Sequence, residues 1–148
     1  MMQISRNIFI GVLCAILSFA CSRSSDEEQI RAIINSAEAA AEARHTSGIM
    51  DLIADDYSDD MGSDKSQLQN VLRGYFLTHP KIKLLVTIEN VNVEGPDNAR
   101  VHLELSTVGT EKFGDSSTSL TAQSEPLRID FKRVGAKWRM VHVERRRD

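Results

Sequence analysis

The sequence predicts an α+β domain in which N-terminal helices pack on a curved antiparallel β-sheet. Two observations predict this class. Apolar residues recur at helical spacing from Asp26 to His79, and from Ile82 onward they alternate with polar residues at a period of two. Helices followed by strands are typical of α+β layer architectures, and 148 residues correspond to one domain. We therefore expect a single domain over residues 26–148.

The composition excludes several classes of function. The chain has 18 Lys and Arg against 21 Asp and Glu, a net charge of -3. Broad nucleic-acid binding usually needs a basic surplus, so we expect no nucleic-acid partner. Cys14 and Cys21 are the only cysteines, and both lie in or directly after the apolar N-terminal segment described below. The domain therefore has no disulfide framework or thiolate metal cluster, and we expect no cofactor.

Residues 1–20 have the pattern of a signal peptide, with a short basic start and an apolar run from Ile8 to Phe19. That run is too short to span a bilayer, which needs about twenty residues. The segment Leu17-Ser18-Phe19-Ala20-Cys21 resembles a bacterial lipoprotein signal. The resemblance implies a lipid anchor at Cys21, a short tether over residues 21–25, and an outer-membrane location facing the periplasm. The alternative is an ordinary signal peptide or a retained anchor helix, with Cys21 incidental.

Helices are predicted between the leader and Pro80. Ser25 and Glu28 form a capping-box pattern that starts a helix reaching about His45. A short second helix follows from Ile49 to Ile53, and residues 55–62 read as an acidic, turn-rich loop. A third helix starts at Ser63 or Asp64, with Asp64 and Gln67 as a second capping box, and ends before the proline.

Strands are predicted over the rest of the chain. The alternation that begins at Ile82 slips by one residue at Asn90, which indicates a β-bulge. Turns are expected at 95–98 and 134–137, and residues 109–121 as a long hairpin loop or as strand ends. The last strand, Trp138 to Glu144, is apolar on both faces. The inner face of the two best-patterned strands is predicted to carry Ala99, Val101, Leu103, Leu105, Leu127, Ile129 and Phe131.

The order of the predicted elements and two sequence segments resemble those of a known superfamily. The two segments are Leu52 to Gly62, ending in Asp-Asp-Tyr-Ser-Asp-Asp-Met-Gly, and the closing Gly135 to Val143. The chain resembles the nuclear transport factor 2-like superfamily. This implies a cone, in which a bent sheet wraps around helices and often encloses a pocket. Members include ketosteroid isomerases, dehydratases, epoxide hydrolases and non-enzymatic binding domains, so function must be argued from the site.

The predicted inner face holds no residue that can transfer a proton, so no catalytic residue is assigned. His102, Glu104, Arg128 and Asp130 fall on the other face. The candidate ligand-binding residues are the large side chains expected inside the cone or at its opening: Tyr57, Phe76, Leu103, Phe131, Trp138, Met140 and His142. The acidic loop does not fit a calcium-binding pattern with either Asp56 or Tyr57 as the first ligand position, so no metal site is expected.

The leading interpretation is a non-catalytic, periplasm-facing lipoprotein domain that binds a small apolar ligand or a protein partner. Val141 and Val143 are expected on the outer sheet face, where a homodimer would form. The first alternative is a small enzyme of the isomerase or dehydratase type that uses Tyr57, Asp55 or His142. The second alternative is a structural subunit of an envelope assembly.

Overall fold

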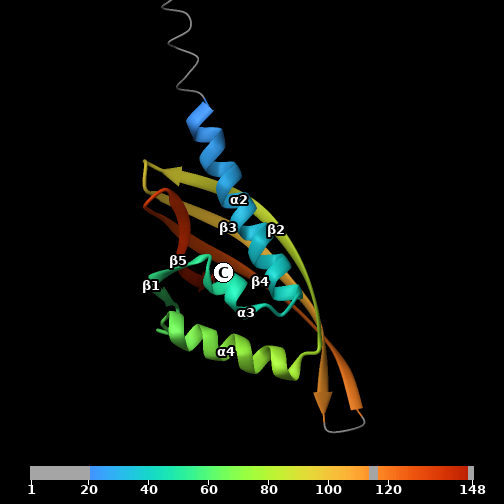
Figure 1. Cartoon of the computed structure of the whole chain (residues 1–148). Helices are drawn as coiled ribbons and strands as arrows, with labels where there is room; N and C mark the ends of the chain where they lie inside the picture. Colours follow the sequence, from blue (N-terminus) through green and yellow to red (C-terminus); the bar gives the residue numbers. More distant parts are fainter. Residues whose placement is uncertain (1–20, 114–116, 147–148) are drawn as a thin grey trace, which may run out of the picture.

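The computed structural model describes the backbone of residues 21–113 and 117–146, and the side chains of residues 26–108 and 122–146 (Figure 1). Its elements, in order, are α2 (Cys21–Glu42), α3 (Thr46–Met50), β1 (Ile53–Asp59), α4 (Lys65–Thr78), β2 (Lys81–Glu94), β3 (Asn98–Phe113), β4 (Ser117–Val134) and β5 (Lys137–Arg145). The predicted α+β class is confirmed. The predicted signal peptide, residues 1–20, lies outside the described residues.

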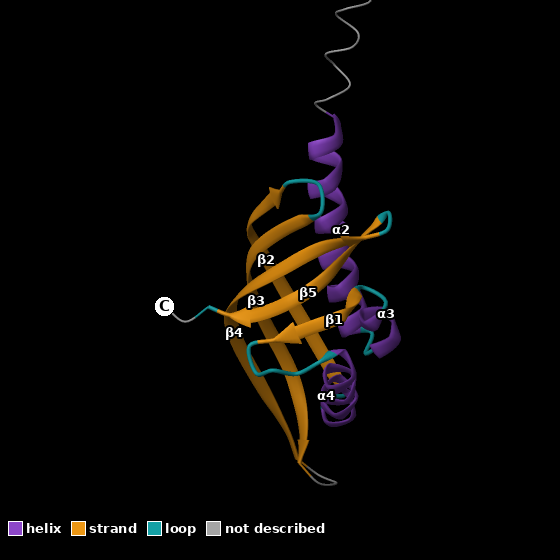
Figure 2. Ribbon diagram, turned by 90° about the vertical axis from the view of Figure 1, so that its left-hand side faces the viewer, coloured by secondary structure: helices purple, strands orange, loops and turns teal. Residues whose placement is uncertain are grey.

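The five strands form one curved sheet in the order β1-β5-β4-β3-β2. Strands β2 to β5 pair antiparallel along the chain, and β1 pairs parallel with β5. Figure 2 shows the three helices on one side of this sheet. We call that side the concave face and the other side the convex face. Helix α2 packs against β2 and α3, whereas α4 packs against β1 and α3.

Local signals place helix α4 as predicted but not the start of α2. The Asp64 carboxylate accepts from the Gln67 backbone amide at 2.8 Å, and the Gln67 side chain accepts from the Asp64 amide at 2.8 Å, so this capping box is confirmed. The capping box predicted at Ser25 is wrong, because α2 begins at Cys21 and Ser25 lies inside it. The short helix also comes earlier than predicted, at Thr46–Met50.

The predicted acidic loop is largely a strand. Residues Ile53–Asp59 form β1, and the turn follows only at residues 60–62. The strand forms because it pairs with β5, which comes much later in the chain and leaves no local signal. Two exposed acids of β1 pair with basic side chains from elsewhere. Asp55 lies 2.9 Å from Lys65 Nζ, and Asp56 pairs with Lys132.

The sheet pattern is otherwise confirmed. The β2–β3 register shifts between Ile88 and Asn90, at the predicted bulge. Strands β3 and β4 continue to Phe113 and from Ser117, so residues 109–121 are mainly strand ends and not a long loop. Five of the seven predicted inner residues are buried, and Leu105 and Leu127 pack partly buried against them. The side chains buried most completely are Trp138, Phe131, Ile30 and Val101.

Candidate functional site

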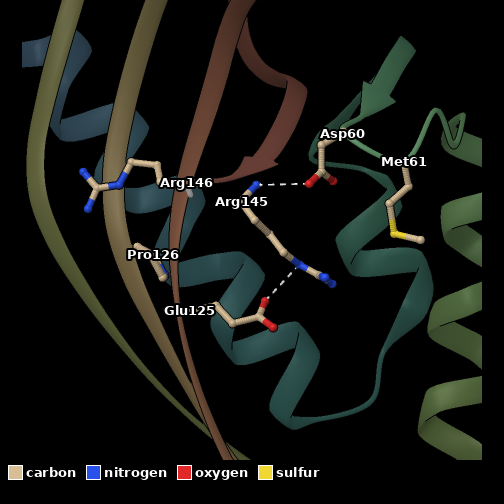
Figure 3. A pocket seen from close by; sticks show the side chains of 6 residues that line it. All are labelled: Asp60, Met61, Glu125, Pro126, Arg145 and Arg146. Atoms are coloured by element: carbon tan, nitrogen blue, oxygen red, sulfur yellow. Dashed lines mark hydrogen bonds and ion pairs between the residues drawn. The ribbon is translucent and has the colours of Figure 1, made fainter. Parts of the chain in front are cut away.

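An ion pair stands where the concave face opens to solvent. In the strand register, Glu125 of β4 lies opposite Leu105, and Arg145 of β5 lies opposite Leu127. Directly opposed residues share a face of the sheet, and both leucines pack against the core. Glu125 and Arg145 therefore continue the apolar concave face outward. The Arg145 Nε atom lies 3.1 Å from a Glu125 carboxylate oxygen (Figure 3).

This ion pair borders a pocket of about 400 Å³, which we call the mouth pocket. The loop after β1 forms its other side. This loop is held by the backbone amide of Asp60, which donates to the Val143 carbonyl at 3.2 Å, and by Asp59, whose carboxylate accepts from the amides of Met61 and Ser63 at 3.0 and 2.7 Å. The lining residues are Asp60, Met61, Glu125, Pro126, Arg145 and Arg146.

Hydrogen bonding and burial have opposite effects on the pKa of the Asp59 carboxyl group, and the combined effect lowers it. Burial acts to raise the pKa of this carboxyl, but the amides and the side chain of Ser63 lower it more, so its pKa ends below the usual range. An ionised Asp59 keeps accepting both backbone amides at neutral pH. The loop therefore presents Met61, which is 77% exposed, in a defined position at the pocket edge.

The positive charges of the mouth pocket are paired within the protein. Arg145 pairs with Glu125. The side chain of Arg146 points away from Arg145 (Figure 3), and two of its nitrogens lie 3.0 and 3.1 Å from the Glu89 carboxylate. Each partner carboxylate offsets the charge of its guanidinium group and so weakens its attraction for other anions, although the buried Nε atom of Arg146 has no hydrogen-bond partner. The rest of the lining is the thioether of Met61, the ring of Pro126 and the exposed carboxylate of Asp60, which accepts from the Arg145 backbone amide at 3.5 Å.

Five of the seven predicted ligand-binding side chains lie in the closed core and do not line the mouth pocket: Tyr57, Leu103, Phe131, Trp138 and Met140. Tyr57 is 5% exposed. Burial is the main cause that raises its pKa, and the nearby carboxylates of Asp59 and Asp60 add to the effect. Its phenol therefore stays protonated at neutral pH. Phe76 is also buried, but it borders a different pocket, described below.

His142 lies on the convex face. The β4–β5 register pairs Asp130 with His142 and Phe131 with Met140, so Val141 is an extra residue in β5. An extra residue in a strand moves the side chains that follow it to the opposite face of the sheet. His142 thus turns outward, with Nδ1 3.1 Å from the Ser58 hydroxyl and Nε2 3.6 Å from Glu144.

The same bulge turns Val143 inward. Val143 lies opposite Ile129 and packs against the core, so the prediction of an outer strip containing Val143 is wrong. The convex face instead carries ion pairs, including Arg100 with Asp130 at 2.8 Å and Arg128 with Glu144 at 2.9 Å. Homodimerisation through this face stays a prediction.

Asp55, the remaining candidate of the enzyme alternative, lies on the same strand as Tyr57, but its side chain is exposed whereas that of Tyr57 is buried. The Asp55 side chain is fully exposed, and the ammonium group of Lys65 lowers its pKa. Asp55 is ionised and exposed, Tyr57 is buried and neutral, and His142 contacts Ser58 and Glu144 on the convex face. Among the described residues, no group of three or more His, Cys, Asp or Glu side chains is arranged to hold a metal ion. No helix within the described residues is long and apolar enough to cross a membrane.

The sequence analysis missed Glu125 and Arg145. A signal for Glu125 existed in the sequence. Side chains two positions apart in a strand point to the same face, so Glu125 should face inward like Leu127. No comparable signal existed for Arg145, since its direction depends on the bulge at Val141.

No protein-family model and no curated protein matches the chain. Solved structures do match it. A provisionally assigned scytalone dehydratase from Novosphingobium aromaticivorans has a TM-score of 0.74 at 11% identity, covering 84% of this chain and 85% of that chain. A nuclear transport factor 2-like superfamily protein from Salmonella enterica has a TM-score of 0.71 at 14% identity, covering 84% and 92%. A protein with a cystatin-like fold from Caulobacter vibrioides has a TM-score of 0.66 at 16% identity, covering 80% and 87%.

Sequence identity at this level shows a shared fold but does not show a shared activity, because proteins of one fold can have many unrelated functions. The likeness nevertheless covers 84% of this chain in both cases. The chain therefore has the fold of the nuclear transport factor 2-like, or cystatin-like, superfamily.

Proposed function

We propose that the protein is a non-catalytic binding domain that takes a small, mainly apolar ligand at the mouth pocket. The observation that carries this proposal is the pocket's pairing of charges. Its two arginines are ion-paired with Glu125 and Glu89, and the apolar part of its lining is formed by Met61 and Pro126, beside the exposed carboxylate of Asp60. A volume of about 400 Å³ lies within the range of pockets that bind small molecules, roughly 300–1,000 Å³.

The arrangement of ionisable groups supports a non-catalytic role. General acid–base chemistry needs a group of suitable pKa within reach of the substrate. Tyr57 is buried, does not line the mouth pocket and stays protonated; Asp55 stays ionised beside Lys65; and His142 faces the opposite side of the sheet. These three positions favour binding over the isomerase or dehydratase alternative.

Native mass spectrometry of the protein, produced from the full chain, tests the proposal. We expect a co-purified molecule of a few hundred daltons, on the order of what such a pocket holds. Met61→Glu should abolish retention, because it places an unpaired charge at the apolar edge. Leu85→Glu is the matched control, since Leu85 on β2 is also an exposed apolar residue, 65% exposed, and does not line the pocket.

Each outcome separates the alternatives. Retention by the wild type and Leu85→Glu, but not by Met61→Glu, supports the ligand site. Equal retention by all three moves the ligand elsewhere. Wild-type protein recovered in a stoichiometric complex with a second protein, and without a small molecule, supports the partner or envelope-assembly alternative.

We also propose that the chain is anchored by a lipid on Cys21 and faces the periplasm from the outer membrane. The cut-site segment that ends in Cys21 supports this proposal. Cys21→Ala should release the protein from the membrane fraction, and Cys14→Ala, inside the leader, should not. Full membrane recovery of Cys21→Ala would refute the lipid anchor while leaving the mouth pocket untouched.

A further inference from the structure

A second pocket lies between the end of helix α2 and the second half of α4. We call it the arginine groove. Its volume is about 410 Å³, and its lining residues are Ala43, Arg44, Thr46, Arg73, Phe76 and Leu77. None of them lines the mouth pocket. The groove therefore needs an explanation of its own.

Arg44 and Arg73 are unusual among the arginines of this protein. Of the nine arginines whose side chains are described, the other seven each form an ion pair or a hydrogen bond through the guanidinium group, and only the guanidinium groups of these two form neither. Both line the same groove, which contains no acidic residue.

The nearest acid along the chain is engaged elsewhere. The carboxylate of Glu42 accepts from the Leu84 amide and from Lys83 Nζ, both at 2.9 Å. It therefore ties helix α2 to strand β2 and leaves Arg44 without a partner. Two unneutralised guanidinium groups in one concave site raise the local positive potential and attract anions.

The wall between the arginines is apolar. Phe76 is 8% exposed and contributes to the groove from the core side, whereas Leu77 is 84% exposed. An exposed leucine beside two free guanidinium groups fits a ligand with an apolar body and an anionic head. Guanidinium groups bind carboxylate and phosphate groups through two parallel hydrogen bonds, a bidentate geometry that ammonium groups do not reproduce.

The backbone at Arg44 adds an independent observation. Arg44 has a φ of 56°, the only positive φ among the described non-glycine residues. The amide of His45 donates to the Ala40 carbonyl at 2.7 Å and that of Arg44 to the Ala41 carbonyl at 2.9 Å. These bonds form a Schellman motif, whose left-handed position glycine usually occupies without strain. The chain instead holds an arginine there, with its side chain at the groove.

We propose that the arginine groove binds a small amphiphile with an oxyanionic head, a carboxylate or a phosphate, seated between Arg44 and Arg73 with its apolar part against Phe76 and Leu77. The lining residues Ala43 and Arg44 follow directly after the C-terminal end of α2, whereas Cys21 is the first residue of that helix; Figure 1 shows α2 as one unbroken helix between these points. At 1.5 Å per residue, the 22 residues of α2 separate them by about 33 Å. That distance favours a free amphiphile over the lipid headgroups beside an anchor at Cys21.

Octyl phosphate, octanoate and octanol serve as probes in isothermal titration calorimetry with the full-length protein. The two anions should bind and octanol should not. Arg44→Gly and Arg73→Gln should each weaken anion binding about five- to tenfold, since each removes one charge-assisted contact. Arg44→Gly is the informative variant because glycine suits the left-handed backbone, so its melting temperature should equal or exceed that of the wild type.

Matched controls isolate the groove. Lys137→Gln removes an exposed cation at the β4–β5 turn and should leave binding unchanged. Leu77→Ser should weaken binding, whereas Val71→Ser, which changes an exposed apolar residue of α4 outside the lining, should not. The proposal fails if octanol binds as well as octyl phosphate, if Arg44→Gly binds like the wild type, or if Lys137→Gln weakens binding equally. It also fails if vesicles of anionic phospholipid bind through the same arginines while the soluble probes do not.

Discussion

The carboxylate of Asp26, in helix α2, lies 2.7 Å from the guanidinium group of Arg133, on β4. The same oxygen accepts the indole N–H of Trp138 at 3.3 Å, and the Arg133 guanidinium stacks 4.4 Å from the centre of the Trp138 ring. Trp138 is 1% exposed. One carboxylate therefore satisfies the polar atom of a buried indole and fastens helix α2 to the β4–β5 hairpin.

Asp26→Asn should lower the free energy of unfolding by roughly 1–3 kcal/mol at neutral pH, because it removes charge-assisted hydrogen bonds. The hydrogen bond from Arg133 is the main cause that lowers the pKa of Asp26, and that from Trp138 adds to it. A lowered folded-state pKa contributes stability above the ordinary value of 3.8, and this contribution is lost as pH falls through the folded-state value.

Urea denaturation between pH 7 and pH 2.5 measures this effect. The variant should lose less stability on acidification than the wild type. Glu27→Gln is the control, because its ion pair with Arg31 is exposed and should contribute less than about 0.5 kcal/mol. Wild-type and Asp26→Asn curves that run parallel over the whole range would contradict the assignment.

Two glycine substitutions should change stability in opposite directions. Gly74 lies inside helix α4, and an added Cβ would meet nothing within 4 Å. Gly74→Ala should therefore stabilise the protein by roughly 0.5–1 kcal/mol. Gly135 forms the β4–β5 turn with a φ of 62°, so Gly135→Ala should destabilise it by about 1 kcal/mol or more. Thermal melts followed by circular dichroism check both signs, and a shift in the same direction would disprove the argument.

The capping box of α4 should be measurable. Asp64→Ala should measurably lower the free energy of unfolding, because it leaves the Gln67 amide without its acceptor. Asp64→Ser should retain most of this stability, since serine also caps helices. Gln69→Ala, on the exposed part of the same helix, should have little effect in chemical denaturation. Equal losses for alanine and serine at position 64 would point to a role for the carboxylate other than capping.

Tyr57 should ionise only when the protein unfolds in alkali. Its raised folded-state pKa means that stability is fully present below the ordinary tyrosine value of 10.0 and is lost as pH rises above it. Absorbance at alkaline pH should show a late phase that coincides with unfolding. Tyr57→Phe should remove that phase, and Tyr75→Phe should retain it. A Tyr57 that titrates near pH 10 in folded protein would place its hydroxyl in water and reopen it as a site residue.

The local parts of the fold follow from the sequence. The helical stripe containing Ile30 and Ile34, the capping box at Asp64 and the bulge beside Asn90 are each set by residues within a few positions of one another. The capping pattern at Ser25 failed although its spacing is correct, because a capping pair is equally compatible with the interior of a longer helix.

The segment around Tyr57 shows where local reasoning fails. Aspartates at positions 55, 56, 59 and 60 have the composition of a turn, yet most of the segment is strand β1. Two of these acids are neutralised by Lys65 and Lys132, and the backbone pairs with β5. Each of these partners comes from another element, so no window of sequence contains the information.

By itself, the sequence determined the α+β class, the helical faces and the buried side of strands β3 and β4, because hydrophobic periodicity is a local property. Only the tertiary structure decided that β1 joins the sheet, that His142 faces outward and that Arg145 meets Glu125 at the mouth pocket. It also brought the unpaired Arg44 and Arg73 to one groove. Strand register, a single-residue bulge and helix packing join residues far apart in the chain, and local periodicity does not specify them.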